Sequence, residues 1–240
     1  QYVLSFALIL GGLSTLRFEM ALPLARKRMD AIHILILALS LSAIVVLITT
    51  VLFLIDPPLL ARLYQSLEFR ALIFFIPVIL FLEANNNVFS FWYTRTKNFK
   101  VSSIGKSFLG MGTALAQLTI AFSGFVSGFG LLLGYIIGQL ASVSWYIFMF
   151  FKTNDAIQPH AVSVKGLIDQ AKEHKNFPLF SSWNVLLNTL ARNLPPLLLV
   201  SYFSVVEAGF FAIGIRLLNI PLNTLGMSVG QVYFQQIARY

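Results

Sequence analysis

Three arginines, Arg17, Arg192 and Arg216, and one glutamate, Glu83, lie inside long apolar stretches of the sequence. A charge at the centre of a lipid-spanning helix costs at least about 2.5 kcal/mol, so such residues usually face protein or water. A guanidinium stays charged and grips an oxyanion through two parallel hydrogen bonds. The arginines are therefore candidates for lining an anion-binding cavity. The alternative is that each one pairs with a carboxylate or extends to the headgroup region.

Glu83 is followed by two asparagines that share its helix face, because Asn86 and Asn87 stand three and four residues later. The carboxylate has two candidate roles, offsetting an arginine or binding a proton or sodium ion. The asparagines either donate hydrogen bonds to hydroxyl groups of a ligand or join neighbouring helices. Glu19 stands only two residues from Arg17, which predicts that these two side chains lie on different helix faces.

The composition indicates an integral membrane protein. Of 240 residues, 58% are hydrophobic and 11% are charged, against about 25% charged in soluble domains. Lipid leaves backbone groups no partners outside the chain, so each spanning segment is expected to be helical and the fold all-α. No cysteine is present, which excludes disulfides, thiolate nucleophiles and thiolate metal sites. No nucleophile motif, P-loop or histidine metal spacing is present either, so we expect no enzyme, metal or bound cofactor apart from a coupling ion.

Seven apolar segments are predicted to form a polytopic bundle. They run over residues 1–24, 30–55, 69–93, 104–126, 129–151, 177–203 and 209–234. The chain begins with Gln1 inside the first of them, so we expect a fragment whose preceding helix is missing. Prolines inside the spans, at Pro77, Pro195, Pro196 and Pro221, are expected to break helical hydrogen bonds.

The loops between these segments differ sharply in charge, which predicts the orientation. One alternating set carries eleven basic residues and the other two. The first set comprises Arg26, Lys27, Arg28, Arg95, Lys97, Lys100, Lys152, Lys165, Lys172, Lys175 and Arg239. The second set comprises Arg62 and Arg70. The first set is expected to be cytoplasmic. The net charge of +8 therefore needs no nucleic-acid partner.

Two local patterns predict packing. Val164, Leu167, Ile168 and Ala171 recur at helical spacing after Ser163, a candidate N-cap. This pattern predicts a short amphipathic helix on the cytoplasmic surface within the linker 152–176, or alternatively an ordinary helical connector. Glycines recur every fourth residue over 130–138, which predicts a close approach between two helices.

Five stretches resemble the polysaccharide-biosynthesis or O-antigen flippases of the multidrug/oligosaccharidyl-lipid/polysaccharide exporter superfamily. They are LRFEMALPLARKRMDAI, FWYTRTKNFK, GLLLGYIIGQLAS, NFPLF and GFFAIGIRLLNIPLNTLGMSVGQVYF. The resemblance implies twelve or more helices in two lobes around a central cavity. Residues 1–151 would form most of the first lobe, 152–176 a cytoplasmic linker and 177–240 the start of the second lobe.

The resemblance also implies a substrate, a lipid pyrophosphate-linked oligosaccharide carried across a bacterial or archaeal cytoplasmic membrane. Arg17, Arg192 and Arg216 would hold the pyrophosphate, with Glu83, Asn86 and Asn87 also lining the cavity. Membrane lipids and polysaccharide-assembly proteins are the expected partners. The alternatives are a cation-coupled drug exporter of the same superfamily and, less favoured, a membrane polysaccharide polymerase or ligase. The enzyme is disfavoured because the longest outward loop, Asp56–Glu68, is short.

Overall fold

The structure is a computed structural model and describes residues 11, 14–55, 74–124, 128–153, 162–204, 206–207, 209–211, 213–215 and 217–218. Every element in this part of the chain is helical, which confirms the all-α prediction. The chain divides into two compact units, Gln1–Leu187 and Asn188–Tyr240. The predicted lobe boundaries at residues 151 and 177 stay a prediction.

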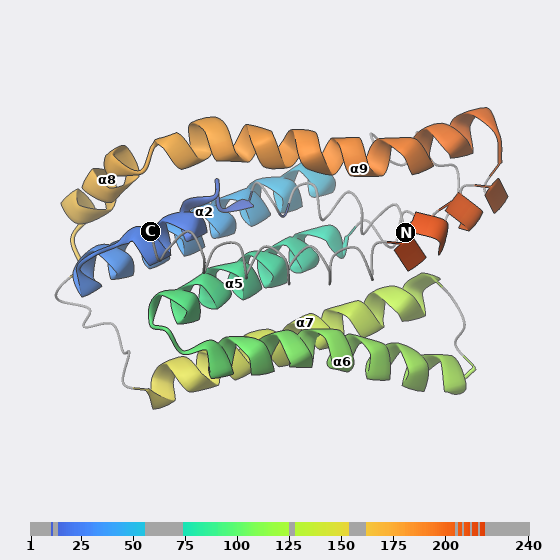
Figure 1. Ribbon diagram of the computed structural model, residues 1–240, viewed down its shortest axis with the longest axis horizontal. Coiled ribbons are helices and arrows are strands. Elements are labelled where there is room, and N and C mark those ends of the chain that lie inside the picture. Colours follow the sequence, from blue (N-terminus) through green and yellow to red (C-terminus); the bar gives the residue numbers. More distant parts are fainter. Residues whose placement is uncertain are drawn as a thin grey trace, which may run out of the picture. The chain divides into compact units, whose positions relative to one another are not determined.

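Four long helices form the body of the first unit (Figure 1). They are α2 (Arg28–Ile55), α5 (Ile76–Arg95), α6 (Phe99–Phe122) and α7 (Gly128–Lys152). Helix α5 packs against α2, α6 and α7, while α6 and α7 share the most extensive contact. Of the described helices, α2 and α7 are long and apolar enough to cross a membrane, as expected for a helical membrane protein.

Helices α5 and α6 begin at different residues from those predicted. Pro77 lies in the first turn of α5, where its missing N–H leaves no helical hydrogen bond unmade. Its predicted role as a break inside a span is therefore wrong. Helix α6 begins at Phe99 instead of residue 104, because the Asn98 side chain caps it by accepting from the backbone N–H of Val101 at 3.5 Å.

Small residues bring α6 and α7 together, as the glycine spacing predicted. A Cβ at Gly134 would lie 2.9 Å from the Gln117 backbone nitrogen, and one at Gly138 would lie 2.6 Å from that of Thr113. Neither distance leaves room for a side chain. The two helices therefore approach so closely that glycine is required at these two positions.

The first predicted segment is not α-helical throughout. Gly11 and Ser14 are helical, but Leu16 and Arg17 have positive φ angles of 49° and 63°. A 3-10 helix, η1 (Phe18–Leu24), then leads to α2. Left-handed residues end a right-handed helix, so the expected continuous helix over residues 1–24 is wrong in its last third. Residues 1–10 lie outside the described part.

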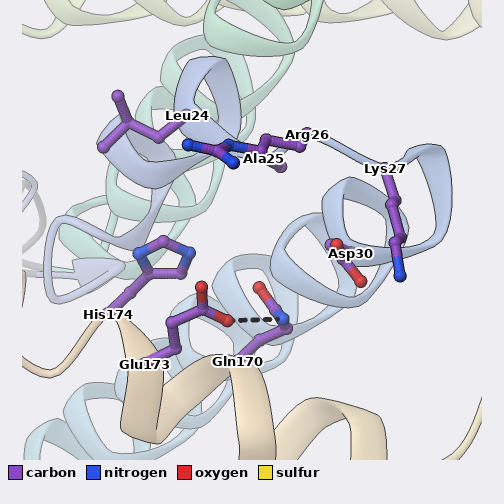
Figure 2. A pocket seen from close by; sticks show the side chains of 8 residues that line it. All are labelled: Leu24, Ala25, Arg26, Lys27, Asp30, Gln170, Glu173 and His174. Carbon is purple, nitrogen blue, oxygen red and sulfur yellow. Dashed lines mark hydrogen bonds between the residues drawn. The ribbon is translucent and has the colours of Figure 1, made fainter.

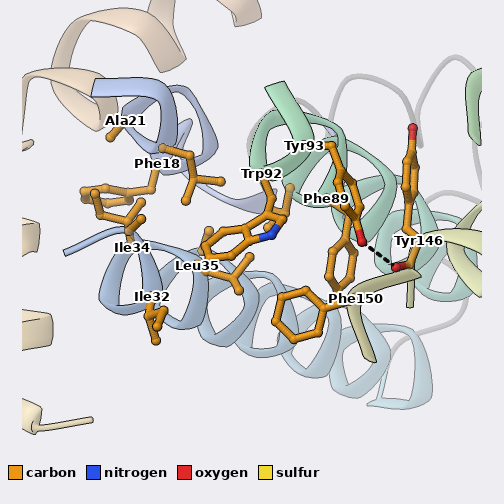
Figure 3. Close-up of a cluster of buried hydrophobic side chains, with 14 of the residues drawn as sticks. Phe18, Ala21, Ile32, Ile34, Leu35, Phe89, Trp92, Tyr93, Tyr146 and Phe150 are labelled. Atoms are coloured by element: carbon orange, nitrogen blue, oxygen red, sulfur yellow. Dashed lines mark hydrogen bonds between the residues drawn. The ribbon is translucent and has the colours of Figure 1, made fainter. Parts of the chain in front are cut away.

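An aromatic cluster joins the ends of α5, α6 and α7 to η1 and α2 (Figure 3). Trp92, Tyr93 and Tyr146 are almost completely buried in it. The Tyr93 hydroxyl donates to the carbonyl of Tyr146 at 3.0 Å, and the Tyr146 hydroxyl donates to that of Ser102 at 3.1 Å. Trp145 Nε1 donates to the carbonyl of Val101 at 3.2 Å. These side chains therefore tie three helices together at one end of the bundle.

The predicted amphipathic helix is present as α8 (Val164–Glu173), and Ser163 is its N-cap, with Oγ accepting from the Gly166 N–H at 3.0 Å. The backbone N–H of Ser163 also donates to His33 Nε2 of α2 at 3.3 Å. Gly166 packs directly on the His33 ring. Val164 and Ile168 are exposed, so part of the predicted apolar face remains free to contact lipid.

The linker is followed by a five-residue π-helix, η3 (Phe177–Ser181), which leads into α9 (Ser182–Tyr202). The backbone of α9 remains helical through Pro195 and Pro196. The two prolines therefore do not end the helix, although each lacks the N–H that an interior helical hydrogen bond needs. Pro221 lies outside the described residues.

Candidate functional site

Glu83 is the eighth residue of α5 and faces the chain segment that precedes η1. A Cβ added at Gly11 would lie 3.2 Å from both Cδ and Oε2 of the Glu83 side chain. The Glu83 Oε2 atom is buried and has no hydrogen-bond partner among the described residues. This arrangement leaves one carboxylate oxygen available to a cation or a hydrogen-bond donor.

Asn86 lies one turn later on α5 and connects this helix to α7. Its Nδ2 donates to Gln139 Oε1, to the carbonyl of Gln139 at 3.3 Å and to that of Leu82 at 3.2 Å. Gln139 Nε2 in turn donates to the Tyr135 hydroxyl at 2.7 Å. Asn86 thus makes the helix-bridging contact that was one of its two expected roles. Asn87 is only partly buried.

Glu83, Asn86, Tyr135 and Gln139 together form what we call the α5–α7 polar cluster. Glu83 shares a face of α5 with Asn86, which donates to Gln139 on α7. Asn86 Oδ1, like Glu83 Oε2, is buried without a hydrogen-bond partner in the described part of the chain. Two buried acceptors without donors are costly, so a cation or a hydroxyl-bearing ligand would stabilise the cluster.

Sequence reasoning found Glu83 and Asn86 but missed Gln139 and Tyr135. A signal was present, because Tyr135 and Gln139 stand four residues apart in an otherwise apolar run and therefore share a helix face. Polar residues on one face of a spanning helix usually point toward protein. Only the packing of α5 against α7 shows that this face of α7 contacts Asn86.

Arg17 makes an ion pair with Glu19, contrary to the expectation that the two point in different directions. Arg17 Nη1 lies 3.2 Å from Glu19 Oε1, and their side chains are 21% and 2% exposed. The Thr15 hydroxyl donates to Glu19 Oε2. The rule for helix faces fails here because the left-handed Arg17 turns the chain. Glu19 therefore has a role in binding Arg17 that sequence reasoning missed.

Of the three candidate arginines, only Arg17 has a side chain that the structure describes. The backbone of Arg192 is part of α9, but its side chain is not among the described atoms. Arg216 is not among the described residues. Arg17 pairs with Glu19 instead of Glu83. The predicted ion pair between Glu83 and an intramembrane arginine stays a prediction that concerns Arg192 and Arg216.

The family model of polysaccharide biosynthesis proteins matches residues 24–240. The chain belongs to this family. The match confirms the resemblance seen in the sequence and supports a role in polysaccharide biosynthesis or transport at a membrane. Comparisons with curated proteins and with solved structures found no match.

The matched range of this polysaccharide biosynthesis protein contains most of the candidate residues. Glu83, Asn86, Asn87, Arg192 and Arg216 lie inside it, whereas the Arg17–Glu19 pair precedes it. The α5–α7 polar cluster also falls entirely within the matched residues. The cluster and the two later arginines are therefore the strongest candidates for the functional site of the family member.

Proposed function

We propose that this polysaccharide biosynthesis protein is a flippase for a lipid pyrophosphate-linked oligosaccharide. It moves the substrate from the inner to the outer leaflet of a bacterial or archaeal cytoplasmic membrane by alternating access. Family membership and a polar cluster buried inside an all-helical bundle support this proposal. No bond of the substrate is broken or formed, so the protein needs no catalytic group.

In this proposal each kind of side chain meets a different part of the substrate. Arg192 and Arg216 hold the pyrophosphate through charge-assisted hydrogen bonds, with Arg17 near the entrance to the path. The free acceptors Glu83 Oε2 and Asn86 Oδ1 take hydrogen bonds from sugar hydroxyls, and Asn87 adds a further amide. The lipid tail remains in the bilayer.

A second candidate function is a cation-coupled drug exporter of the same superfamily. The observation that favours it is the buried Glu83 carboxylate, which forms no ion pair with any described residue. A carboxylate of this kind suits a cationic drug or a coupling ion. Three intramembrane arginines favour an anionic substrate, so the flippase is the preferred function.

Arg216 provides the test of the flippase proposal. In the intact protein, glycan export should fall in the order wild type, Arg216→Lys, Arg216→Ala, because lysine keeps the charge but loses the planar fork. Hydrogen bonds to charged groups contribute about 1.5–3 kcal/mol, so the alanine variant should lose roughly ten- to a hundredfold at limiting substrate. Surface glycan is measured together with protein abundance.

Arg62→Ala, in a predicted outward loop, is the matched control and should export normally. Normal export by Arg216→Ala at normal abundance would show that Arg216 does not bind substrate. Loss of the protein itself would show that Arg216 is a structural ion-pair partner. Export of a cationic dye without any change in surface glycan would favour the drug exporter.

The coupling role of Glu83 has a separate test, Glu83→Gln. The variant should accumulate normally, because no ion pair among the described residues is lost, and it should still bind substrate. Its export should no longer depend on a proton or sodium gradient. Poor accumulation would instead indicate that Glu83 pairs with an arginine outside the described side chains. Normal abundance with unchanged gradient dependence would exclude both roles. Glu68→Gln, in the predicted outward loop, is the control.

A further inference from the structure

A polar pocket of about 290 Å³ lies between the loop that precedes α2 and the end of α8, within the first compact unit (Figure 2). One side is formed by the loop and the first turn of α2, and the other by the last turn of α8. The lining residues are Leu24, Ala25, Arg26, Lys27, Asp30, Gln170, Glu173 and His174. None of these belongs to the α5–α7 polar cluster, so the pocket is a second candidate site.

Both walls of the pocket are held in place by contacts outside its lining. Arg95, at the end of α5, donates from Nε to the carbonyl of Ala25 at 3.3 Å and from Nη2 to that of Lys27 at 3.0 Å. Helix α8 is fixed on α2 through the hydrogen bond between Ser163 and His33. The pocket is therefore formed before any ligand enters it.

The charged groups of the pocket remain unpaired with one another. Arg26 and Lys27 supply positive charge and Asp30 and Glu173 negative charge, yet no ion pair joins them in the described part of the chain. Figure 2 shows Arg26 across the pocket from Glu173 and His174. A ligand that carries both charges would satisfy both sets of side chains at once.

Gln170 adds a buried acceptor to this pocket. Its side chain is 8% exposed, and Nε2 donates to Glu173 Oε2 at 3.1 Å. Gln170 Oε1 has no hydrogen-bond partner among the described residues. A buried acceptor left unmet costs about 1–3 kcal/mol, so the ligand should carry an N–H or O–H donor at this end.

We propose that this pocket binds the headgroup of an ethanolamine phospholipid, in addition to the proposed transport substrate. The phosphate contacts Arg26 and Lys27, and the ammonium donates to Gln170 Oε1 and Glu173. An ammonium offers three donors, whereas choline offers none and a glycerol headgroup has no positive charge. The basic loop is predicted to lie at the cytoplasmic headgroup level, and Leu24, 61% exposed, provides an apolar exit for the acyl chains.

The experiment titrates the purified intact protein with phosphatidylethanolamine, phosphatidylcholine and phosphatidylglycerol of matched acyl chains, and counts bound lipid by native mass spectrometry. Phosphatidylethanolamine should bind at least about tenfold more tightly than the other two, as expected for one charge-assisted hydrogen bond gained. Glu173→Gln should remove this preference, because Glu173 contacts the ammonium that only phosphatidylethanolamine offers as a donor. Arg26→Gln should weaken the binding of all three lipids, because each of them carries the phosphate, and Arg26→Lys should keep most of the binding.

Lys165→Gln and Asp169→Asn are the matched controls, because both residues are exposed on α8 and neither lines the pocket. They should bind like the wild type. Equal binding of phosphatidylglycerol would overturn the ammonium contact and with it the proposal. Equally tight binding of soluble glycerophosphoethanolamine would assign the pocket to a soluble ligand and overturn a lipid site. Unchanged preference in Glu173→Gln, or unchanged binding of the three lipids to Arg26→Gln, would also overturn the proposal.

Discussion

Replacing Gly138 by leucine is expected to prevent α6 and α7 from packing at their present distance. A Cβ at this position would lie 2.6 Å from the Thr113 backbone nitrogen and 2.8 Å from its Cα, and it would overlap Thr113 Oγ1. Backbone atoms cannot move aside by a change of rotamer, so the helices must separate. Overpacking costs about 1–3 kcal/mol, and here we expect a loss at or above the upper value. Thermal unfolding of the purified intact protein measures it.

Gly110→Leu is the matched control for this change. Gly110 lies on α6, and no described atom is within 4 Å of a Cβ built there. Both substitutions remove a glycine from a helix interior and therefore gain the same helix propensity. A Gly138→Leu protein as stable as Gly110→Leu would contradict the close approach of the two helices.

Replacing Glu19 by glutamine is expected to destabilise the first unit by about 3 kcal/mol. Removing one partner of a buried ion pair typically costs about 3–5 kcal/mol, because the other charge is left uncompensated. Arg17 is partly exposed, which places the expected loss at the lower end of that range. The stability of the intact protein against heat or denaturant is the measurement.

The double variant Arg17→Met, Glu19→Met tests whether the loss of stability in Glu19→Gln is electrostatic. It removes both charges at once, so it should recover much of the stability that Glu19→Gln loses. Asp169→Asn, an exposed carboxylate changed to an amide, should have little effect. A double variant that is no more stable than Glu19→Gln would show that the loss is not electrostatic.

The extent of the helices was predictable where apolar runs end in polar residues. Helices α2 and α7 agree with the predicted segments within two residues at each end. The starts of α5 and α6 were wrong for two local reasons. For α5, the apolar residues before Ile76 extended the predicted segment past the true start, although Pro77 is typical of a first helical turn. For α6, the segment was predicted from apolar residues alone, so the polar first turn that Asn98 caps was left out.

The sequence predicted individual residues of the candidate site, but not which residues they contact. Glu83 and Asn86 were found because polar groups are costly inside an apolar span. Their neighbours were not, because Asn86 meets Gln139 across 53 residues of sequence, a contact that depends on how α5 packs on α7. The pairing of Arg17 with Glu19 was missed because helix-face rules presuppose an α-helix, and the chain turns at Arg17.

The hydrogen bonds around Tyr93 and Tyr146 have a mechanical consequence. They fasten α5, α6 and α7 where α5 ends at Arg95, α6 begins at Phe99 and α7 ends at Lys152. Helices α6 and α7 are also packed closely at Gly134 and Gly138, so they move as a pair. A rotation of α5 against this pair would pivot about the end at Arg95, and its displacement would grow along α5 toward Ile76. Opening of the bundle would therefore separate α5 from the pair at the Ile76 end.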